Sequence, residues 1–273
     1  ISALTGIEIA LWDLAGRATG LPVYRLLGGR FRDRIRIYCD CHAGKDDRPE
    51  SYAREAKRVV GLGFTAIKFD IDEIHHPDKY DPWNWTASPG EIASMVERVA
   101  AVREAIGPKV DLAIDMHGRY DIHAAIRVAC ALEPYNLLWL EEPVPPENVA
   151  AMREVKRATR TPICAGENLY LRYGFRELIE GQAVDAVMPD IPKCCGLSEG
   201  RKIANMAEVY YIPFAPHNVC GPLGTMASCH VCARSERSSK STNASPLRSG
   251  EPCAWAISVN CLTAKLSEPA KRR

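Results

Sequence analysis

The sequence predicts an α/β fold, a (β/α)7β-type TIM barrel that is incomplete. Seven short apolar runs recur along its 273 residues, and a helical pattern follows each of them. The runs are continuous rather than alternating, which is typical of strands buried on both faces of a parallel sheet. Seven strand–helix units in series favour a barrel. An open doubly wound sheet is the alternative, but no glycine-rich phosphate turn follows the first predicted strand.

The predicted strands lie at residues 34–39, 66–70, 111–115, 137–141, 161–165, 183–188 and 211–215. The helices between them carry start signals: Ser88, Pro89 and Glu91 supply an N-cap, a first-turn proline and a capping-box carboxylate. The apolar face of this helix is marked by Ile92, Val96, Val99 and Ile106. A second stripe, over 197–209, is formed by Ile203, Met206 and Ala207.

Residues 1–30 precede the predicted barrel, which occupies residues 31–233. They contain an amphipathic helix that carries Ile7, Leu11 and Leu14 on one side. The chain also lacks an initiator methionine. We therefore expect it to begin inside a longer protein.

Residues 234–273 differ sharply from the repeat, because no apolar periodicity is present between 234 and 246. The one candidate for an eighth strand, 253–259, comes far later than the repeat predicts. We expect 234–250 to be irregular and poorly packed, with a makeshift strand near Trp255. A barrel without a regular eighth strand does not close.

The charge balance excludes several classes of partner. Thirty-five basic and thirty-four acidic residues give a formal net charge of +1, so no bulk basic field exists to hold nucleic acid or an anionic membrane. No apolar run approaches the roughly 18 residues of a membrane span, and the first residues do not form a secretory signal pattern. We expect a cytoplasmic location.

The eleven cysteines do not resemble a disulfide framework. Cys39, Cys130 and Cys164 lie in apolar stretches, where free cysteine behaves as a small hydrophobic residue. Cys229 and Cys232 form a lone CxxC, and no second ligand pair at zinc-like spacing accompanies it. We expect free thiols in a reducing compartment, with this pair more exposed than the core cysteines.

Acidic side chains fall at the ends of successive predicted strands. Asp115, Glu141, Glu167 and Asp190 follow one another at spacings of 26, 26 and 23 residues, about one strand–helix unit each. Equivalent positions on the strands of a parallel barrel face the same carboxyl-terminal mouth, where active sites of this fold lie. Adjacent carboxylates repel unless a positive charge lies between them. A hard divalent cation such as Mg²⁺ satisfies oxygen ligands of this kind.

Basic residues complete the ring around the predicted mouth. Lys68 lies toward the end of the second strand, His117 follows Asp115, and His217 follows the seventh strand. We expect Lys68, His117 and His217 to be catalytic, together with Asp190. His217 comes one unit after Asp190, so this carboxylate is placed to hold the imidazole and set its tautomer. The remaining histidines of the central region are expected to be structural or on the surface: His75, His76 and His123.

These motifs resemble the mandelate racemase subgroup of the enolase superfamily. The segments that carry the resemblance are SALTGIEIALWD at 2–13, GLPVYRLLGG at 20–29, LEEP at 140–143, AGEN at 165–168, PDIPK at 189–193 and PHN at 216–218. The first two are similar to the segment that joins the family's amino-terminal capping domain to its barrel. The others are similar to its strand-end signatures.

The resemblance implies Asp115, Glu141 and Glu167 as Mg²⁺ ligands. It also implies Asp190 and His217 as an acid–base dyad. The reaction that it implies is abstraction of the proton α to a carboxylate, giving an enediolate held by Mg²⁺. The charge of the metal is needed because such a proton is too weakly acidic for imidazole alone.

Within the subgroup, the Asp-Met-His sequence at 115–117 resembles the acid-sugar dehydratases, whose corresponding histidine, here His117, protonates the departing β-hydroxyl. Racemases place a Lys-x-Lys pair on the second strand, and here the motif is Lys68-Phe69-Asp70. We therefore expect a Mg²⁺-dependent dehydratase that converts an aldonate into a 2-keto-3-deoxy acid. A racemase or epimerase of α-hydroxy acids is the alternative enzyme.

Loop 72–87 contains Trp83 and Trp85 and is expected to cover a hydroxylated substrate. The alternative is that these aromatic side chains pack on a second subunit, in which case the chain forms a homo-oligomer.

Two departures from the family bear on turnover by this chain. Most of the capping domain, which closes the mouth, has no counterpart, so residues 1–30 are interpreted as its remnant. The 234–273 segment fits no pattern of the family, which adds an eighth strand at this point. A catalytically inactive fragment that keeps the metal site is therefore the third hypothesis.

Overall fold

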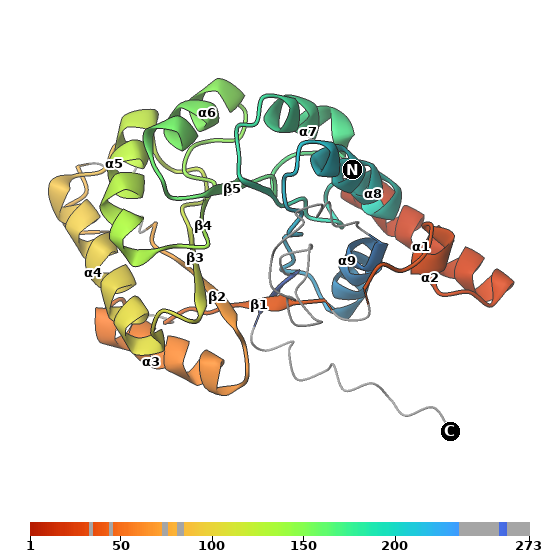
Figure 1. Ribbon diagram of the computed structural model, residues 1–273, viewed down its shortest axis with the longest axis horizontal. Coiled ribbons are helices and arrows are strands. Elements are labelled where there is room, and N and C mark those ends of the chain that lie inside the picture. Colours follow the sequence, from red (N-terminus) through yellow and green to blue (C-terminus); the bar gives the residue numbers. More distant parts are fainter. Residues whose placement is uncertain (33–34, 44–45, 73–75, 81–84, 235–256, 261–273) are drawn as a thin grey trace, which may run out of the picture.

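The computed structural model describes residues 1–32, 35–43, 46–72, 76–80, 85–234 and 257–260. Within them, parallel strands form one curled sheet whose order is β6-β5-β4-β3-β2-β1-β7, and helices cover its outer face (Figure 1). The strands are β1 (Ile37–Asp40), β2 (Ala66–Asp70), β3 (Asp111–Asp115), β4 (Trp139–Glu141), β5 (Ile163–Ala165), β6 (Ala186–Val187) and β7 (Ile257–Asn260). The predicted α/β fold, an incomplete barrel, is confirmed.

Helices alternate with these strands along the chain. They are α1 (Ser2–Thr19), α2 (Val23–Leu26), α3 (Pro49–Gly61), α4 (Pro89–Ile106), α5 (Ile122–Leu132), the 3-10 turn η1 (Glu133–Tyr135), α6 (Val149–Ala158), α7 (Leu171–Glu180), α8 (Gly196–Val209) and α9 (Pro222–Arg234). The predicted start of α4 is confirmed, because the Glu91 amide donates to Ser88 Oγ at 3.0 Å. None of the described helices is long and apolar enough to cross a membrane.

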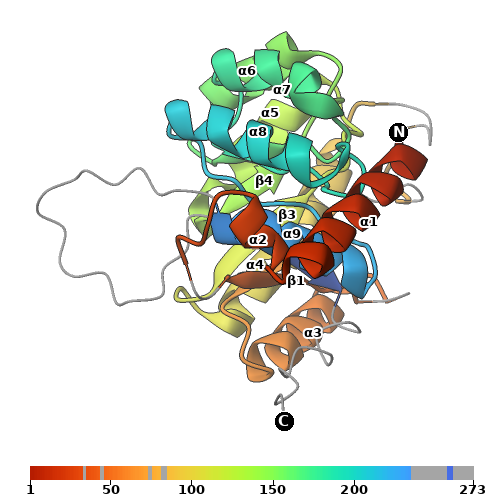
Figure 2. The same ribbon diagram turned by 90° about the vertical axis from the view of Figure 1, so that its right-hand side faces the viewer.

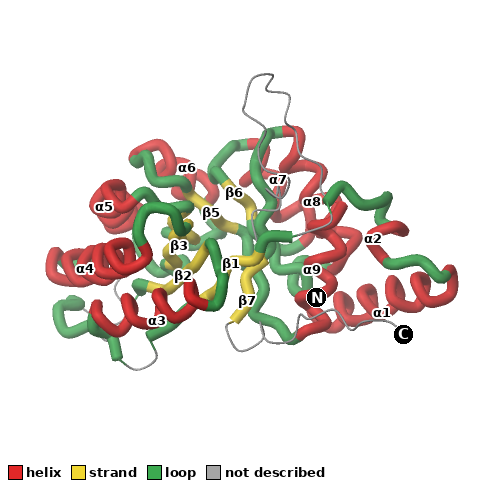
Figure 3. Tube along the Cα trace, turned by 60° about the horizontal axis from the view of Figure 1, so that its bottom comes forward, coloured by secondary structure: helices red, strands yellow, loops and turns green. Residues whose placement is uncertain are grey.

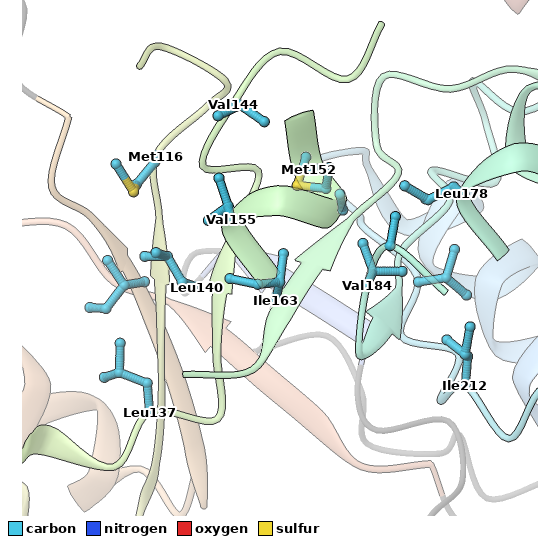
Figure 4. Close-up of a cluster of buried hydrophobic side chains, with 14 of the residues drawn as sticks. Met116, Leu137, Leu140, Val144, Met152, Val155, Ile163, Leu178, Val184 and Ile212 are labelled. Atoms are coloured by element: carbon cyan, nitrogen blue, oxygen red, sulfur yellow. The ribbon is translucent and has the colours of Figure 1, made fainter. Parts of the chain in front are cut away.

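Strand alternation divides the core into two layers. Ile67 and Phe69 of β2 point outward into the apolar layer between the sheet and the helices, and Ala66 points into the barrel. Figure 4 shows part of the outer layer, where Leu140 and Ile163 of neighbouring strands lie with side chains of α6. The inner layer is formed by Tyr38, Ala66, Ala113, Trp139, Cys164, Ala186, Met188 and Ala215. This layer fills the barrel below its mouth.

The sheet is weakest where the barrel would close. The predicted strand 211–215 is reduced to a single bridge between Phe214 and Val187. Pro213 is the reason, because it has no N–H to extend a ladder, although its carbonyl accepts from Val187 at 2.9 Å.

At the opposite edge, β7 pairs in parallel with β1, and Figure 3 shows the two strands side by side. The expected late strand is therefore present, although Trp255 and 234–250 lie outside the described residues except for Arg234. No pairing joins β7 to Phe214 within the described residues, so the two edges stay apart.

Helix α1 projects beside the barrel instead of burying its apolar side (Figure 2). Ile7, Leu11 and Leu14 are 59%, 59% and 61% exposed. The helix is held by Glu8, whose carboxylate accepts from the backbone amides of Leu197 and Ser198 at 3.0 and 2.9 Å. A carboxylate at the amino end of α8 satisfies amides that have no partner within the helix.

The cysteine predictions are partly wrong. Cys39 and Cys164 are buried as expected, but Cys130 is exposed on α5. Cys232 is fully buried and Cys229 is half-buried, because α9 packs against α2 and α8 and carries this pair into the outer core. The described cysteines are all free.

Candidate active site

Strand parity brings three charged side chains into the barrel. The inward positions of β2, β3 and β4 are occupied by Lys68, Asp115 and Glu141. Two residues earlier on the same strands, the inward positions are Ala66, Ala113 and Trp139. Asp115 and Glu141 lie directly opposite each other in the β3–β4 register. Both side chains are almost completely buried. Neighbouring strands therefore present their carboxylates at the same height of the mouth.

Glu167 reaches the same place from the turn after β5. One carboxylate oxygen from each of Asp115, Glu141 and Glu167 lies within 4.8 Å of the other two. Gly166 makes the turn possible, because its φ is +137° and a Cβ there would lie 2.8 Å from the Phe175 ring. The structure therefore brings together the three residues predicted as metal ligands.

Lys68 lies between two of these carboxylates. Its ammonium donates to Asp115 Oδ2 at 2.6 Å and to Glu141 Oε1 at 2.7 Å. Although burial opposes the charged form of Lys68, the two carboxylates raise its pKa well above the usual value. Burial and the nearby charge of Asp115 raise the pKa of Glu141. Burial works against ionisation of Asp115 too, but Lys68 lowers its pKa.

His217 lies at the Glu167 end of the cluster. Its Nδ1 is 2.8 Å from Asp190 Oδ2, and its Nε2 is 2.9 Å from Glu167 Oε2. The predicted contact with Asp190 is therefore present. Burial disfavours the charged ring, but the bonds to Asp190 and Glu167 outweigh it and raise the pKa of His217 to about 9. The Lys193 amide donates to the other Asp190 oxygen at 3.0 Å and fixes this carboxylate.

His117 lies at the Asp115 end. Its Nδ1 is 2.8 Å from Asp72 Oδ1 and its Nε2 is 3.7 Å from Asp115 Oδ2. The bond to Asp72 outweighs desolvation and raises the pKa of His117 to about 9. Its backbone has φ +47°, a left-handed conformation that is uncommon for a residue with a side chain. The His117 amide donates to Asp115 Oδ1 at 2.9 Å, so backbone and ring are both held.

Two carboxylates of the site were not singled out from the sequence. Glu142 is buried with φ +38°, and Asn168 donates to its Oε2 at 2.6 Å. Its Oε1 has no hydrogen-bond partner among the described residues. Burial, followed by the charge of Glu167, raises the pKa of Glu142 to about 7. Asp72 is the other, and its contact with Arg119 Nε is 2.5 Å long.

Other predicted residues lie away from this cluster or outside the description. His123 is exposed on α5 and His76 is half-buried, as expected, whereas His75 and Trp83 lie outside the described residues. Trp85 is exposed. Asp70 lies beside the mouth with Asp40 and His42, and burial raises its pKa to about 6.

The donor set of the cluster fits a divalent cation. All three donors are carboxylate oxygens, which are the ligands that hard cations such as Mg²⁺ and Ca²⁺ prefer. The three side chains are buried, and Lys68 alone does not balance their charge. A cation held between them would offset the remaining repulsion.

Comparison with known proteins places this arrangement in a family. Residues 51–249 match the model of the enolase C-terminal domain-like family, and residues 1–28 match the amino-terminal domain of mandelate racemase / muconate lactonizing enzyme. The D-xylonate dehydratase of Haloferax volcanii is 48% identical over 85% of this chain and 57% of its own length. The D-galactonate dehydratase of Variovorax paradoxus is 37% identical over 85% of this chain and 58% of its own length. The chain thus spans a little over half the length of these curated relatives.

Solved structures agree with the sequence comparison. A mandelate racemase/muconate lactonizing enzyme-like protein from Rubrobacter xylanophilus superposes with a TM-score of 0.87 at 50% identity, over 97% of this chain and 66% of that one. A member of the enolase superfamily from Salmonella Typhimurium gives 0.83 at 31% identity, over 96% and 66%. The chain belongs to the mandelate racemase/muconate lactonizing enzyme family of the enolase superfamily.

Proposed function

We propose that this barrel catalyses the Mg²⁺-dependent dehydration of a sugar acid of the aldonate class to a 2-keto-3-deoxy acid. The observation that carries the proposal is the placement of two histidines at the two ends of one carboxylate cluster. Nε2 of His217 faces Glu167, and Nε2 of His117 faces Asp115. Dehydration needs one group to take the α-proton and another to supply a proton to the departing β-hydroxyl.

His217 is the proposed base for the first step. Asp190 accepts from Nδ1, so Nε2 is the nitrogen that would take the α-proton once the ring is neutral. A cation that neutralised Glu167 would remove one of the two carboxylates that raise the pKa of the ring. The ring is 6% exposed, so little water competes for this nitrogen. A bound divalent cation would stabilise the negative charge that develops on the substrate carboxylate as the proton leaves.

His117 is the proposed acid for the second step. Its Nε2–H gives a proton to the β-hydroxyl oxygen while the carbon–oxygen bond breaks, and water departs. The ring is 37% exposed, which allows a hydroxylated substrate to approach it. Lys68 has no part in this proton transfer, since its ammonium is bonded to Asp115 and Glu141 and holds their charge.

The relatives support the substrate class. The proteins that match over 85% of this chain are named for D-xylonate and D-galactonate, both aldonates. Racemisation by two bases would need a second lysine near Lys68, and Asp70 stands at that position. Dehydration therefore accounts better for the residues that are present.

The test uses the full chain with a panel of aldonates in D₂O, with Mg²⁺ or with EDTA. We expect a Mg²⁺-dependent α-keto acid from at least one member. Deuterium exchange at the α-carbon with inversion and no keto acid would overturn dehydration in favour of racemisation. Neither product nor exchange with any member would show that the chain is a fragment that does not turn over.

A further inference from the structure

Asp72 is a buried carboxylate that the steps above do not use. It lies two residues beyond the end of β2, and its side chain is 4% exposed. Its Oδ1 is 2.8 Å from Nδ1 of His117, and its Oδ2 is 2.5 Å from Nε of Arg119. A buried carboxylate that forms an ion pair with arginine is a hydrogen-bond acceptor at both oxygens and has one orientation.

This contact determines which nitrogen of His117 can act. An ionised carboxylate only accepts hydrogen bonds, so Nδ1 of His117 carries a hydrogen that it donates to Asp72. The ring then presents Nε2 to Asp115, 3.7 Å away. The backbone of His117 is held separately by its amide bond to Asp115 Oδ1. With both ends fixed, the ring has little freedom to turn Nε2 out of the mouth.

We propose that Asp72 is a positioning residue that holds His117 with Nε2 directed at the substrate, and that Arg119 keeps Asp72 in place. The proposal deepens the dehydratase proposal and rests on it. When Nε2–H passes its proton to the β-hydroxyl oxygen, the bonding pair of the carbon–oxygen bond goes to that oxygen and water leaves. The neutral ring that remains keeps its hydrogen on Nδ1, where Asp72 still accepts it.

The arrangement repeats the one around His217. There Asp190 Oδ2 lies 2.8 Å from Nδ1, the same distance and the same nitrogen. Asp190 is fixed by a backbone amide, whereas Asp72 is fixed by a side chain, Arg119. Carboxylates that orient metal-bound histidines change metal affinity or activity 10- to 100-fold when removed, and we expect an effect of this order for Asp72.

The experiment measures the His117 ring directly, using the full chain with ¹⁵N-labelled histidine. The nitrogen shifts report which ring atom carries the hydrogen, and His117→Gln identifies the signals. The variants are Asp72→Ala, which removes the acceptor, and Asp72→Asn, which keeps one. The matched control is Asp78→Asn, an exposed carboxylate of the same loop. Arg119→Met is the second variant if Asp72→Ala does not fold.

At a pH above the His117 pKa of about 9, where the ring is neutral, we expect a single Nδ1–H form in the unmodified chain, in the control and in Asp72→Asn, and a mixture of forms in Asp72→Ala and Arg119→Met. For the substrate that turns over, kcat should fall about 10- to 100-fold in Asp72→Ala with little change in KM, and less in Asp72→Asn. Unchanged nitrogen shifts in Asp72→Ala would overturn the proposal. Absence of product in the unmodified chain would instead contradict the dehydratase proposal, and the shifts would still test the positioning.

Discussion

The two ends of the carboxylate cluster use the same device in different surroundings. His217 and His117 are each held through Nδ1 by an aspartate at 2.8 Å. His217 is almost completely buried and its partner Asp190 follows a strand, whereas His117 is over one-third exposed and its partner Asp72 lies in a loop.

The difference in burial matches the proposed roles. A base that removes a weakly acidic α-proton works best where water is excluded, because its interactions are strongest there. An acid that protonates a leaving hydroxyl must be reached by a polyhydroxylated substrate and must let water depart. Two histidine–aspartate pairs of the same geometry would therefore serve the two proposed steps, and the difference in burial would separate their roles.

Removal of the shared cluster should affect both ends and have the largest effect. We expect Glu141→Gln or Glu167→Gln to weaken Mg²⁺ binding by more than about 100-fold, because each variant removes a charged oxygen ligand. The circular dichroism spectrum should stay close to that of the unmodified chain. Isothermal calorimetry measures the affinity, with Glu154→Gln, an exposed change on α6, as the control. Unchanged affinity in both variants would show that the cluster is not the metal site.

Histidine variants should show which step of the reaction depends on each end of the cluster. We expect His217→Asn to lose α-proton exchange with D₂O and keto acid formation together, each by about 10²- to 10⁴-fold. His117→Gln should lose keto acid formation by a similar factor but retain exchange, since the first step does not need it. His123→Asn, an exposed change on α5, is the control. If His117→Gln also abolishes exchange, the two ends do not divide the reaction in this way.

Much of the carboxylate cluster and of its His217 end was predictable from the sequence. Asp115 and Glu141 each close a buried strand and Asp190 comes three residues after β6, so the repeat places all three at one mouth. The contact of His217 with Asp190 follows from the same unit length. These side chains are located by the repeat, so the period of the repeat is enough to find them.

The His117 end of the cluster was less predictable from the sequence, because its contacts depend on loop geometry. Asp72 and His117 are 45 residues apart, and Asp72 lies in a polar loop with no strand to give it a direction. Glu142 was missed for a related reason, since its left-handed backbone turns the side chain of a strand-end residue inward. For Asp72, the available sequence signal was its position two residues beyond Asp70, the last residue of β2.

The closure of the barrel was predicted in outline only. A late strand was expected, and β7 is present beside β1. The shortening of 211–215 to one bridge was missed, although Pro213 within the run argued against a full strand. The exposed side of α1 was also missed, because an amphipathic pattern indicates an apolar face without saying what covers it.

Lys68 is bonded to Asp115 and Glu141 within the cluster, and its loss should reduce stability rather than chemistry. In EDTA we expect Lys68→Met to lower the free energy of unfolding by about 3–5 kcal/mol, because it leaves buried carboxylates without their cation. Mg²⁺ should recover part of this loss. The control is Arg17→Met, whose exposed pair with Asp13 should contribute less than about 1 kcal/mol. Urea unfolding measures both, and equal losses would contradict a special role for the buried pair.

A third histidine tests whether contacts with carboxylates are what raise the pKa of His117 and His217. His230 on α9 has no aspartate at Nδ1; instead this atom accepts from the Tyr24 amide at 3.2 Å, and burial lowers the pKa of His230 from its ordinary 6.5. Because the pKa of His230 is lower in the folded than in the unfolded state, the neutral ring contributes to folding stability above pH 6.5. This contribution to stability is lost as the pH falls through the folded-state pKa of the ring. Protonation of Nδ1 removes the acceptor for Tyr24, at a cost of about 1 kcal/mol.

Because the loss of this hydrogen bond changes stability only slightly, the test needs a variant that keeps an acceptor for the Tyr24 amide but does not titrate. In His230→Gln the side-chain carbonyl replaces Nδ1, so its unfolding free energy should fall less steeply than that of the unmodified chain as the pH drops below 6.5. Urea unfolding at several pH values measures the two slopes, and the carboxylates shared by both proteins cancel in the difference. Parallel slopes would mean that His230 does not change its charge on folding. A steeper slope for the variant would mean that the ring is protonated in the folded state even without an aspartate, and the contrast with His117 and His217 would then not depend on their carboxylates.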